Sequence, residues 1–290
     1  MARYKDNPIL SPIYENEWES KYVFNSAMVE LGEKVHYIYR AMGEDMVSRL
    51  GYASSSDGYH IDKRLSYPIL YPINSLEKKG VEDPRITVID DTCIMTYTAY
   101  SDIPQIAITS ITVDDFLKNE WNWSERIYPF PTTTNKNAVI FPEKINDEYV
   151  MFHRIDPNIY IAYSKDLREW RDSKIIIKPR KDSWDSRKIG SAGPPIEIDE
   201  GWLLIYHGVA QDMTYRLGAV ILDKENPENV LFRSTDPFIE PREAYECVGF
   251  VPNVVFSCGA VLQNDNLLIS YGCADTVIGV STFSLDEIIK

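Results

Sequence analysis

Positive charge is scarce in this sequence compared with negative charge. Thirty Lys and Arg stand against 44 Asp and Glu, which gives a formal net charge of −14 over 290 residues. Nucleic acids and anionic membranes attract proteins through basic surfaces. We therefore expect no nucleic-acid partner and no membrane partner. A small anion needs only a local basic cluster, so an anionic substrate is compatible with this charge.

Long apolar runs and paired cysteines are also missing. No run approaches the roughly 18 apolar residues of a membrane span, and the start, MARYKDNPIL, has no apolar core of a secretory signal. The four cysteines show no CxxC spacing, and no acidic or histidine cluster has metal-ligand spacing. We therefore expect free buried thiols, a cytoplasmic location, no metal and no cofactor.

Helical periodicity is nearly absent, and a repeat of strand-like runs stands in its place. Five short apolar runs each end in an aromatic and one distinctive residue: VHYIYR, CIMTYT, YVMFHR, WLLIYH and LLISYG. They recur at intervals of 53 to 65 residues. Their last residues are Arg40, Thr98, Arg154, His207 and Gly272.

Strand-only repeats of this length are typical of β-propellers, in which each repeat forms one blade. Five repeats predict an all-β, five-bladed propeller, and the absence of a linker predicts a single domain over residues 1–290. Blades narrow toward the axis, so we expect small residues on the inner strands. Candidates are Gly51, Ala53, Gly218, Ala219 and Gly279. A β-sandwich or two β domains are the alternatives.

In a closed propeller, the shared position in the repeat would bring Arg40, Arg154 and His207 around one axis. Like charges repel each other unless an anion lies among them. An anion site is one explanation, and separate ion pairs at strand ends are the other.

Other segments add polar groups to this picture. Lys136 precedes a strand in NKNAVIFP, and Lys188 opens the turn RKIGSAGPPI. With Arg154 and His207 they form a set of nitrogen donors that suits a tetrahedral oxyanion such as phosphate. Sugar hydroxyls suit a second set: Asn25 and Ser26 in FNSAM, Asp83 in EDPR, and Asp275 in GCADT. Taken singly, each of these residues is as well explained by a surface turn or a solvated side chain.

The segment GVEDPRI places Asp83 directly before a proline. Proline restricts its own φ and disfavours the helical region for the residue before it. We expect Asp83 to be held extended at a strand entrance, as a proton donor requires. Arg85 is expected to pair with a neighbour and hold this loop. A surface turn is the alternative.

Taken together, these motifs resemble glycoside hydrolase family 130, the β-mannoside phosphorylases and related mannosidases. The resemblance extends over most of the chain through NPILSP, VFNSA, GYASSSDG, EDPRI, KNAVIFPEKI, GWLLIYHGV, YRLGAVILD and VPNVVFSCGAVL. It implies a five-bladed fold and inverting phosphorolysis of a short β-mannoside to α-mannose 1-phosphate, with inorganic phosphate as co-substrate. The alternatives are a β-mannosidase on the same fold and a non-catalytic glycan-binding propeller.

The same resemblance implies a role for each matching residue. Asp83 matches the general acid, and the resemblance implies that its proton is relayed through a mannose hydroxyl. The matching phosphate-binding positions are Lys136, Arg154, Lys188 and His207. The positions matching mannose contacts are Asn25, Ser26, Arg40 and Asp275. Some relatives have arginine where this chain has Lys136. An imidazolium at His207 would help to hold the phosphate. The linkage, β-1,4 or β-1,2, the acceptor sugar and a possible homo-oligomer remain open.

Overall fold

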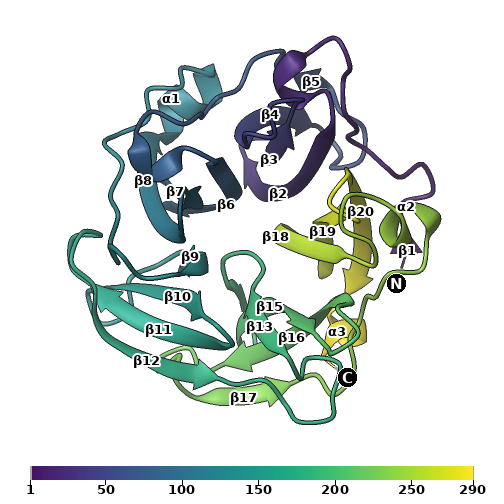
Figure 1. The fold of residues 1–290 in the computed structure, drawn as a ribbon. Helices are drawn as coiled ribbons and strands as arrows, with labels where there is room; N and C mark the ends of the chain where they lie inside the picture. Colours follow the sequence, from purple (N-terminus) through teal and green to yellow (C-terminus); the bar gives the residue numbers. More distant parts are fainter. Residues whose placement is uncertain (1, 290) are drawn as a thin grey trace.

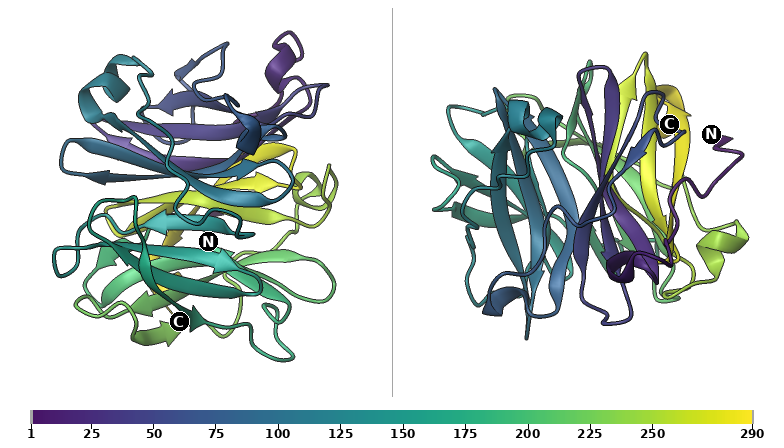
Figure 2. Two further views of the ribbon diagram at one scale, coloured as in Figure 1. Left: turned by 60° about the vertical axis from the view of Figure 1, so that its left-hand side comes forward. Right: turned by 90° about the horizontal axis from the view of Figure 1, so that it is seen from above.

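The computed structural model describes residues 2–289, which form five β-sheets arranged around one axis (Figure 1). The strands run across the thickness of the resulting disc (Figure 2). This confirms the predicted all-β, five-bladed propeller.

The first three blades follow one another along the chain. The first contains β2 (Tyr22–Leu31), β3 (Lys34–Met42), β4 (Arg49–Ser55) and β5 (Lys63–Arg64). The second contains β6 (Gly80–Ile89), β7 (Thr92–Tyr100) and β8 (Pro104–Thr112). The third contains β9 (Lys136–Ile140), β10 (Tyr149–Ile155), β11 (Asn158–Ser164) and β12 (Arg171–Ile177). In all three, consecutive strands pair antiparallel, so each blade is a local meander.

The last two blades complete the ring. The fourth contains β13 (Lys188–Ser191), β14 (Ile196–Ile198), β15 (Gly201–Val209), β16 (Tyr215–Leu222) and β17 (Val230–Arg233). The fifth contains β18 (Val255–Gln263), β19 (Asn266–Cys273), β20 (Val277–Ser284) and β1 (Ala2–Arg3). The short helical segments are η1 (Glu17–Glu19), η2 (Ser75–Glu77), α1 (Val113–Lys118), α2 (Ala244–Cys247) and α3 (Leu285–Ile288).

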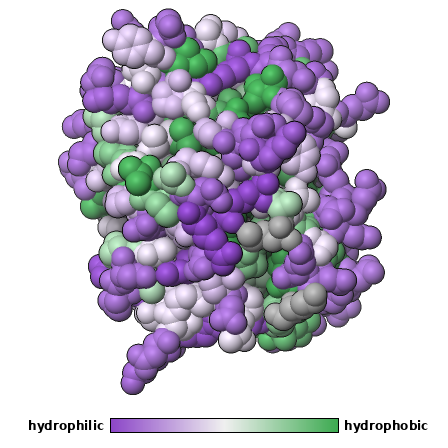
Figure 3. All heavy atoms as spheres, turned by 90° about the vertical axis from the view of Figure 1, so that its right-hand side faces the viewer, coloured by the Kyte–Doolittle hydropathy of each residue, from purple (hydrophilic) through white to green (hydrophobic). Residues whose placement is uncertain are grey.

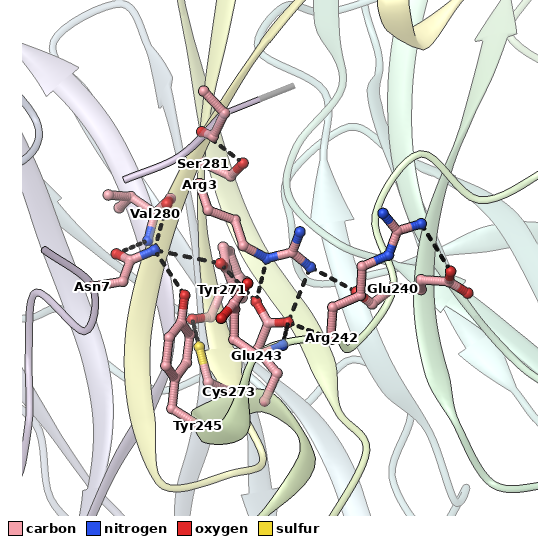
Figure 4. Close-up of polar contacts among 12 residues, drawn as sticks. Arg3, Asn7, Glu240, Arg242, Glu243, Tyr245, Tyr271, Cys273, Val280 and Ser281 are labelled. Atoms are coloured by element: carbon pink, nitrogen blue, oxygen red, sulfur yellow. Dashed lines mark hydrogen bonds and ion pairs between the residues drawn. The ribbon is translucent and has the colours of Figure 1, made fainter. Parts of the chain in front are cut away.

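The amino-terminal strand closes the ring, because β1 pairs antiparallel with β20 as the outer strand of the fifth blade. Arg3 reinforces this closure (Figure 4). Its Nε lies 2.7 Å from Oε1 of the fully buried Glu246, and a second nitrogen lies 3.0 Å from Oε2. The hydroxyl of Tyr271 on β19 donates to the same carboxylate at 3.0 Å.

The aromatic residue that ends each repeated run has a structural role. In four blades it is a buried tyrosine whose hydroxyl donates to a buried carboxylate. These pairs are Tyr39–Glu19, Tyr97–Glu77, Tyr206–Asp185 and Tyr271–Glu246. Each carboxylate is also paired with arginine, so the buried charge is compensated. In the third blade, His153 takes the tyrosine's place and contacts Asn135 at 3.0 Å.

The prediction that small residues mark the inner strands was wrong. The inner strands are β2, β6, β9, β13 and β18, whereas Gly51, Gly218 and Gly279 lie on the third strands β4, β16 and β20. There they make room for rings: a Cβ at Gly51 would lie 2.4 Å from the Tyr39 ring. A Cβ at Gly218 would lie 2.6 Å from the Trp184 ring. The small residues therefore reflect close packing against aromatic rings rather than narrowing toward the axis.

On the face of the molecule shown in Figure 3, hydrophilic residues predominate and hydrophobic ones form small patches. The four cysteines are free thiols; Cys93, Cys258 and Cys273 are buried as predicted, whereas Cys247 is only half-buried. Between residues 2 and 289, no helix has the length and apolar character needed to cross a membrane.

Candidate active site

The five repeated positions lie at equivalent places in the ladders, as the repeat predicts. Each belongs to the second long strand of its blade and pairs with a residue on the inner strand. The pairs are Phe24–Arg40, Glu82–Thr98, Lys136–Arg154, Gly190–His207 and Phe256–Gly272. At Gly272 a side chain is excluded, because a Cβ there would lie 2.2 Å from Oδ1 of Asn25.

Four inner strands, β2, β6, β9 and β18, carry a β-bulge immediately after this pair. In the first three of these strands the next residues are Asn25, Asp83 and Asn137, with φ angles of 50°, 50° and 52°. Asn and Asp tolerate this left-handed region better than other side chains do, and a bulge redirects the side chain. The prediction that Asp83 is extended was therefore wrong, although Asp83 is held in place.

Arg85 holds the Asp83 turn from behind. It is almost fully buried, and it donates to the carbonyl oxygens of Asp83 at 2.7 Å, Ala192 at 2.8 Å and Ser191 at 3.3 Å. These bonds join the second blade to the fourth. The expectation that Arg85 holds the loop is confirmed.

A cavity of about 190 Å³ opens where the bulges meet. Seven of the nine predicted site residues line it: Asn25, Arg40, Asp83, Lys136, Arg154, Lys188 and Asp275. Ser26 is buried behind the wall, and its hydroxyl donates to Ser270 at 2.9 Å. His207 is also fully buried and stands behind Arg154. The assignment of Ser26 to the sugar stays a prediction.

One side of the cavity is a carboxylate cluster held by cations. Oδ1 of Asp83 accepts from Asn25 Nδ2 at 2.9 Å and from Arg40 Nη1 at 3.2 Å. Glu82 lies between Arg40, at 2.6 Å, and Lys136, at 3.1 Å. Burial favours the neutral form of Asp83, but the cations Arg40, Lys136 and Arg85 outweigh it and lower its pKa. Asp83 is therefore ionised at neutral pH.

The pKa of Asp275 is shifted in the opposite direction from the pKa of Asp83, although both residues line the same cavity. Burial raises the pKa of Asp275 to about 7, and the neighbouring charges of Asp83 and Glu82 add to that rise. The charge of Arg40 opposes it. Near neutral pH the cavity thus contains one carboxylate that is ionised and one that is partly protonated.

Two further cations of the cavity lining, Arg154 and Lys188, form what is called here the cationic wall. Nη1 of Arg154 lies 3.3 Å from Nε2 of His207, and Nε of Arg154 lies 2.8 Å from Asp156. Lys188 stands at the end of β13, with its Nζ 5.4 Å from the centre of the Tyr215 ring. Lys136 stands between this wall and Glu82.

The expected imidazolium at His207 is not supported by the structure. Burial lowers the pKa of His207 well below its usual value, and the charges of Arg154, Arg85 and Lys188 lower it further. The geometry agrees, because a guanidinium can only donate and Nε2 must accept from it. His207 is therefore a neutral donor through Nδ1.

Several buried polar atoms around the cavity have no protein hydrogen-bond partner among the described residues. They are Asn25 Oδ1, Asn137 Oδ1, Ser191 Oγ and His207 Nδ1. Buried polar groups are nearly always satisfied, so unpaired ones in a cavity indicate a place for a polar ligand.

The sequence reasoning missed Asn137, Glu82 and Tyr215. Asn137 follows its ladder pair as Asn25 and Asp83 follow theirs, so the repeat contained the signal. Glu82 was visible beside Asp83, but its two cationic partners come from other blades. Tyr215 opens the motif YRLGAVILD in the fourth blade, but that motif was used only for the family resemblance and no role was assigned to the tyrosine. Across residues 2–289, no cluster of His, Cys, Asp and Glu is arranged to hold a metal ion.

Comparison with known proteins identifies the family. A family model described as beta-1,4-mannooligosaccharide phosphorylase, of the glycoside hydrolase 130 group, matches residues 2–290. The chain belongs to glycoside hydrolase family 130. The predicted family resemblance is thereby confirmed.

Relatives with curated functions include several family 130 enzymes. A 1,2-beta-oligomannan phosphorylase from Thermoanaerobacter sp. (strain X514) is 42% identical and covers 99% of this chain and 98% of its own. A beta-1,2-mannobiose phosphorylase from the same strain is 44% identical, with the same coverage. A beta-1,4-mannooligosaccharide phosphorylase from Ruminococcus albus is 33% identical, covering 99% and 89%. The present protein is accordingly a glycoside phosphorylase of family 130.

Solved structures agree with the fold. The beta-1,2-mannobiose phosphorylase from Listeria innocua, in complex with beta-1,2-mannobiose, has a TM-score of 0.87 and 29% identity. The match covers 99% of this chain and 97% of that one. A structure from the work on family 130 hydrolases that target beta-1,2 mannosidic linkages in Candida mannan has a TM-score of 0.89 and 28% identity, covering 98% and 93%.

Proposed function

We propose that this family 130 enzyme cleaves β-1,2-linked mannose from short oligosaccharides with inorganic phosphate. The observation that carries the proposal is one cavity lined both by Asp83 and by the nitrogen groups of Lys136, Arg154 and Lys188. The choice of β-1,2 over β-1,4 is supported by the higher identity of the two Thermoanaerobacter relatives, at 42% and 44%, against 33% for the β-1,4 enzyme.

Phosphate fits the cationic wall. Arg154 offers a planar guanidinium fork and Lys188 and Lys136 offer point charges, so an oxyanion would find donors from the third and fourth blades. Asn137 and His207 Nδ1 lie next to this wall with unused hydrogen-bonding capacity. Gly190 keeps this corner open, because a Cβ there would lie 2.6 Å from the His207 ring and 2.8 Å from Asn137 Oδ1.

Phosphate binding also affects the acid. The pKa of Asp83 is lowered because cations surround its carboxylate. An anion placed among Lys136 and Arg154 partly neutralises that field and raises the pKa of Asp83. Binding of the nucleophile thus favours the protonated form that general acid catalysis requires.

The reaction then follows from these positions. A phosphate oxygen attacks C1 of the mannose while the C1–O bond to the next sugar breaks. The Asp83 proton goes to the departing oxygen, directly or through a mannose hydroxyl. Attack from the opposite face inverts the β-mannoside to α-mannose 1-phosphate. We assign Asn25, Arg40 and Asp275 to the mannose hydroxyls, because they line the wall beside Asp83.

A hydrolase would need a base for water in place of the anion site. Glu82 is engaged by two cations, Arg40 at 2.6 Å and Lys136 at 3.1 Å, so its carboxylate is not free to activate water. The cationic wall therefore favours phosphate over water as the nucleophile.

The test measures sugar release from β-1,2-mannobiose and β-1,4-mannobiose with and without inorganic phosphate. We expect phosphate-dependent formation of α-mannose 1-phosphate, faster with the β-1,2 disaccharide. Equal release without phosphate would establish hydrolysis instead. Faster cleavage of the β-1,4 disaccharide would reverse the linkage assignment alone.

A further inference from the structure

The catalytic cavity is too small for a whole substrate. Small-molecule sites usually occupy ~300–1,000 Å³, whereas this cavity measures about 190 Å³. It has room for the group that reacts, and the rest of the sugar chain must lie outside it.

A second cavity, of about 480 Å³, adjoins the first on the side of the acid and is called here the acceptor cavity. Arg40 belongs to the walls of both, and Glu82, beside Asp83, belongs to the acceptor cavity. None of the phosphate-side residues Arg154, Lys188 and His207 lines it. The leaving sugar departs on the face opposite the phosphate, so the acceptor cavity is on the correct side to receive it.

A third cavity, of about 700 Å³, continues outward on the first blade and is called here the Trp18 cavity. Asp45 lines both the acceptor cavity and the Trp18 cavity. Asp45 is held in place, since its carboxylate accepts from Arg49 at 2.7 and 3.1 Å and from the Val47 amide at 3.1 Å. The bonds from Arg49 lower its pKa, so Asp45 is an ionised acceptor between the two spaces.

The walls of the Trp18 cavity combine aromatic rings with carboxylates. Trp18 is held rigidly, because its indole N–H donates to the Ser66 carbonyl at 3.0 Å and its ring stacks on buried Tyr39. Tyr14 lies on the same cavity and is 84% exposed. Rings of this kind pack against the apolar faces of sugars, and carboxylates accept from sugar hydroxyls. The acidic residues Glu15, Glu17 and Glu44 make the cavity unsuitable for an anionic ligand.

We propose that the Trp18 cavity is a distal binding site for the reducing-end part of a β-mannooligosaccharide. The chain would run from the catalytic cavity through the acceptor cavity and past Asp45 to Trp18 and Tyr14. The preferred substrate is then longer than a disaccharide. This inference rests on the proposed function, because the direction of the chain follows from where the bond is cleaved.

The test compares β-1,2-mannobiose with β-1,2-mannotetraose, and the matching β-1,4 pair, at saturating phosphate. The variants are Trp18→Ala and Tyr14→Ala, and Leu231→Ala on β17 of the fourth blade is the matched control, being 56% exposed. If Trp18→Ala fails to fold, Tyr14→Ala alone tests the distal site, because the Tyr14 side chain is largely in solvent and its removal should not affect folding. Melting temperatures verify folding.

We expect wild-type kcat/KM to be higher for the tetraose than for the disaccharide. Tyr14→Ala should lower the tetraose value about two- to tenfold, the range of a single aromatic contact, and leave the disaccharide value unchanged. Leu231→Ala should change neither. Equal effects of Tyr14→Ala on both lengths, or no effect on either, would overturn the distal site.

Calorimetric titration of the tetraose without phosphate separates this inference from the proposed function. If no phosphate-dependent cleavage occurs but Tyr14→Ala weakens tetraose binding, the distal site stands and the reaction is wrong. If cleavage occurs and tetraose binding is the same in wild type, Tyr14→Ala and Leu231→Ala, the reaction stands and the distal site is wrong.

Discussion

Replacing Asp275 with asparagine should stabilise the empty protein while impairing catalysis. Asp275 lies in the loop between β19 and β20 and shares the cavity with Asp83. Asparagine keeps the shape and removes the charge. The prediction depends on how the pKa of this carboxyl differs between the folded and unfolded chain.

The folded pKa of Asp275 is raised from 3.8 to about 7. The folded state prefers the protonated form of Asp275, so the contribution of this carboxyl to the free energy of unfolding is fully present below pH 3.8. That contribution declines as the pH rises and has been lost above about pH 7. The change corresponds to at most about 4 kcal/mol, at about 1.4 kcal/mol for each pH unit. Solvent reaching the partly exposed side chain through the cavity mouth reduces this value.

The measurement is urea unfolding of wild type and Asp275→Asn at pH 5, 6, 7 and 8 without phosphate or sugar. The advantage of the variant in free energy of unfolding should grow between pH 5 and pH 7 and then level off. Asp102→Asn, at an exposed loop position, is the control and should show no such trend. A difference between Asp275→Asn and wild type that does not change with pH would refute the reasoning.

Three other predictions concern the acid, the anion site and the ring closure. Asp83→Asn should lower kcat for unactivated β-mannosides by ~10²–10⁴-fold with the fold retained, and near-wild-type turnover in a folded sample would refute the assignment. Arg154→Ala should raise the phosphate KM about 10- to 100-fold, since a charge-assisted bond contributes ~1.5–3 kcal/mol, and should abolish the rise in melting temperature that phosphate gives beyond equal ionic strength of chloride. A mannoside KM that rises as much as the phosphate KM would count against the anion site. Arg3→Ala leaves Glu246 buried without its cation and should cost ~3–5 kcal/mol of stability, whereas Arg242→Ala at an exposed position should cost little. Equal unfolding midpoints for these two variants would contradict the closure argument.

The number of blades and the shared ladder position could be predicted from the sequence. Apart from β1, each blade is built from strands that are neighbours in the sequence. Each new blade therefore repeats the same pattern of runs 53 to 65 residues further along the chain. Arg40, Arg154 and His207 therefore fell at equivalent positions, as expected. The ordered motifs were also sufficient for the family, since it matches over nearly the whole chain.

The side-chain environments could not be predicted in the same way. Proline at position 84 suggested an extended Asp83, but the β-bulge, formed by pairing with β7, gave it a left-handed φ of 50°. Gly51 appeared to be an inner residue, but its neighbours are rings from other segments of the first blade. Conformation at a bulge depends on the partner strand, which a local pattern does not contain.

Charge states were decided by tertiary structure alone. His207 and Asp275 carry ordinary pKa values in an unfolded chain, and both are shifted toward their neutral forms because folding removes water and adds charged neighbours. Those neighbours come from different blades, far apart in sequence. The sequence by itself determined five repeated meanders and which polar residues each contributes. Only closure of the ring brought those residues together, because electrostatic interactions depend on distance in space and on burial rather than on position along the chain.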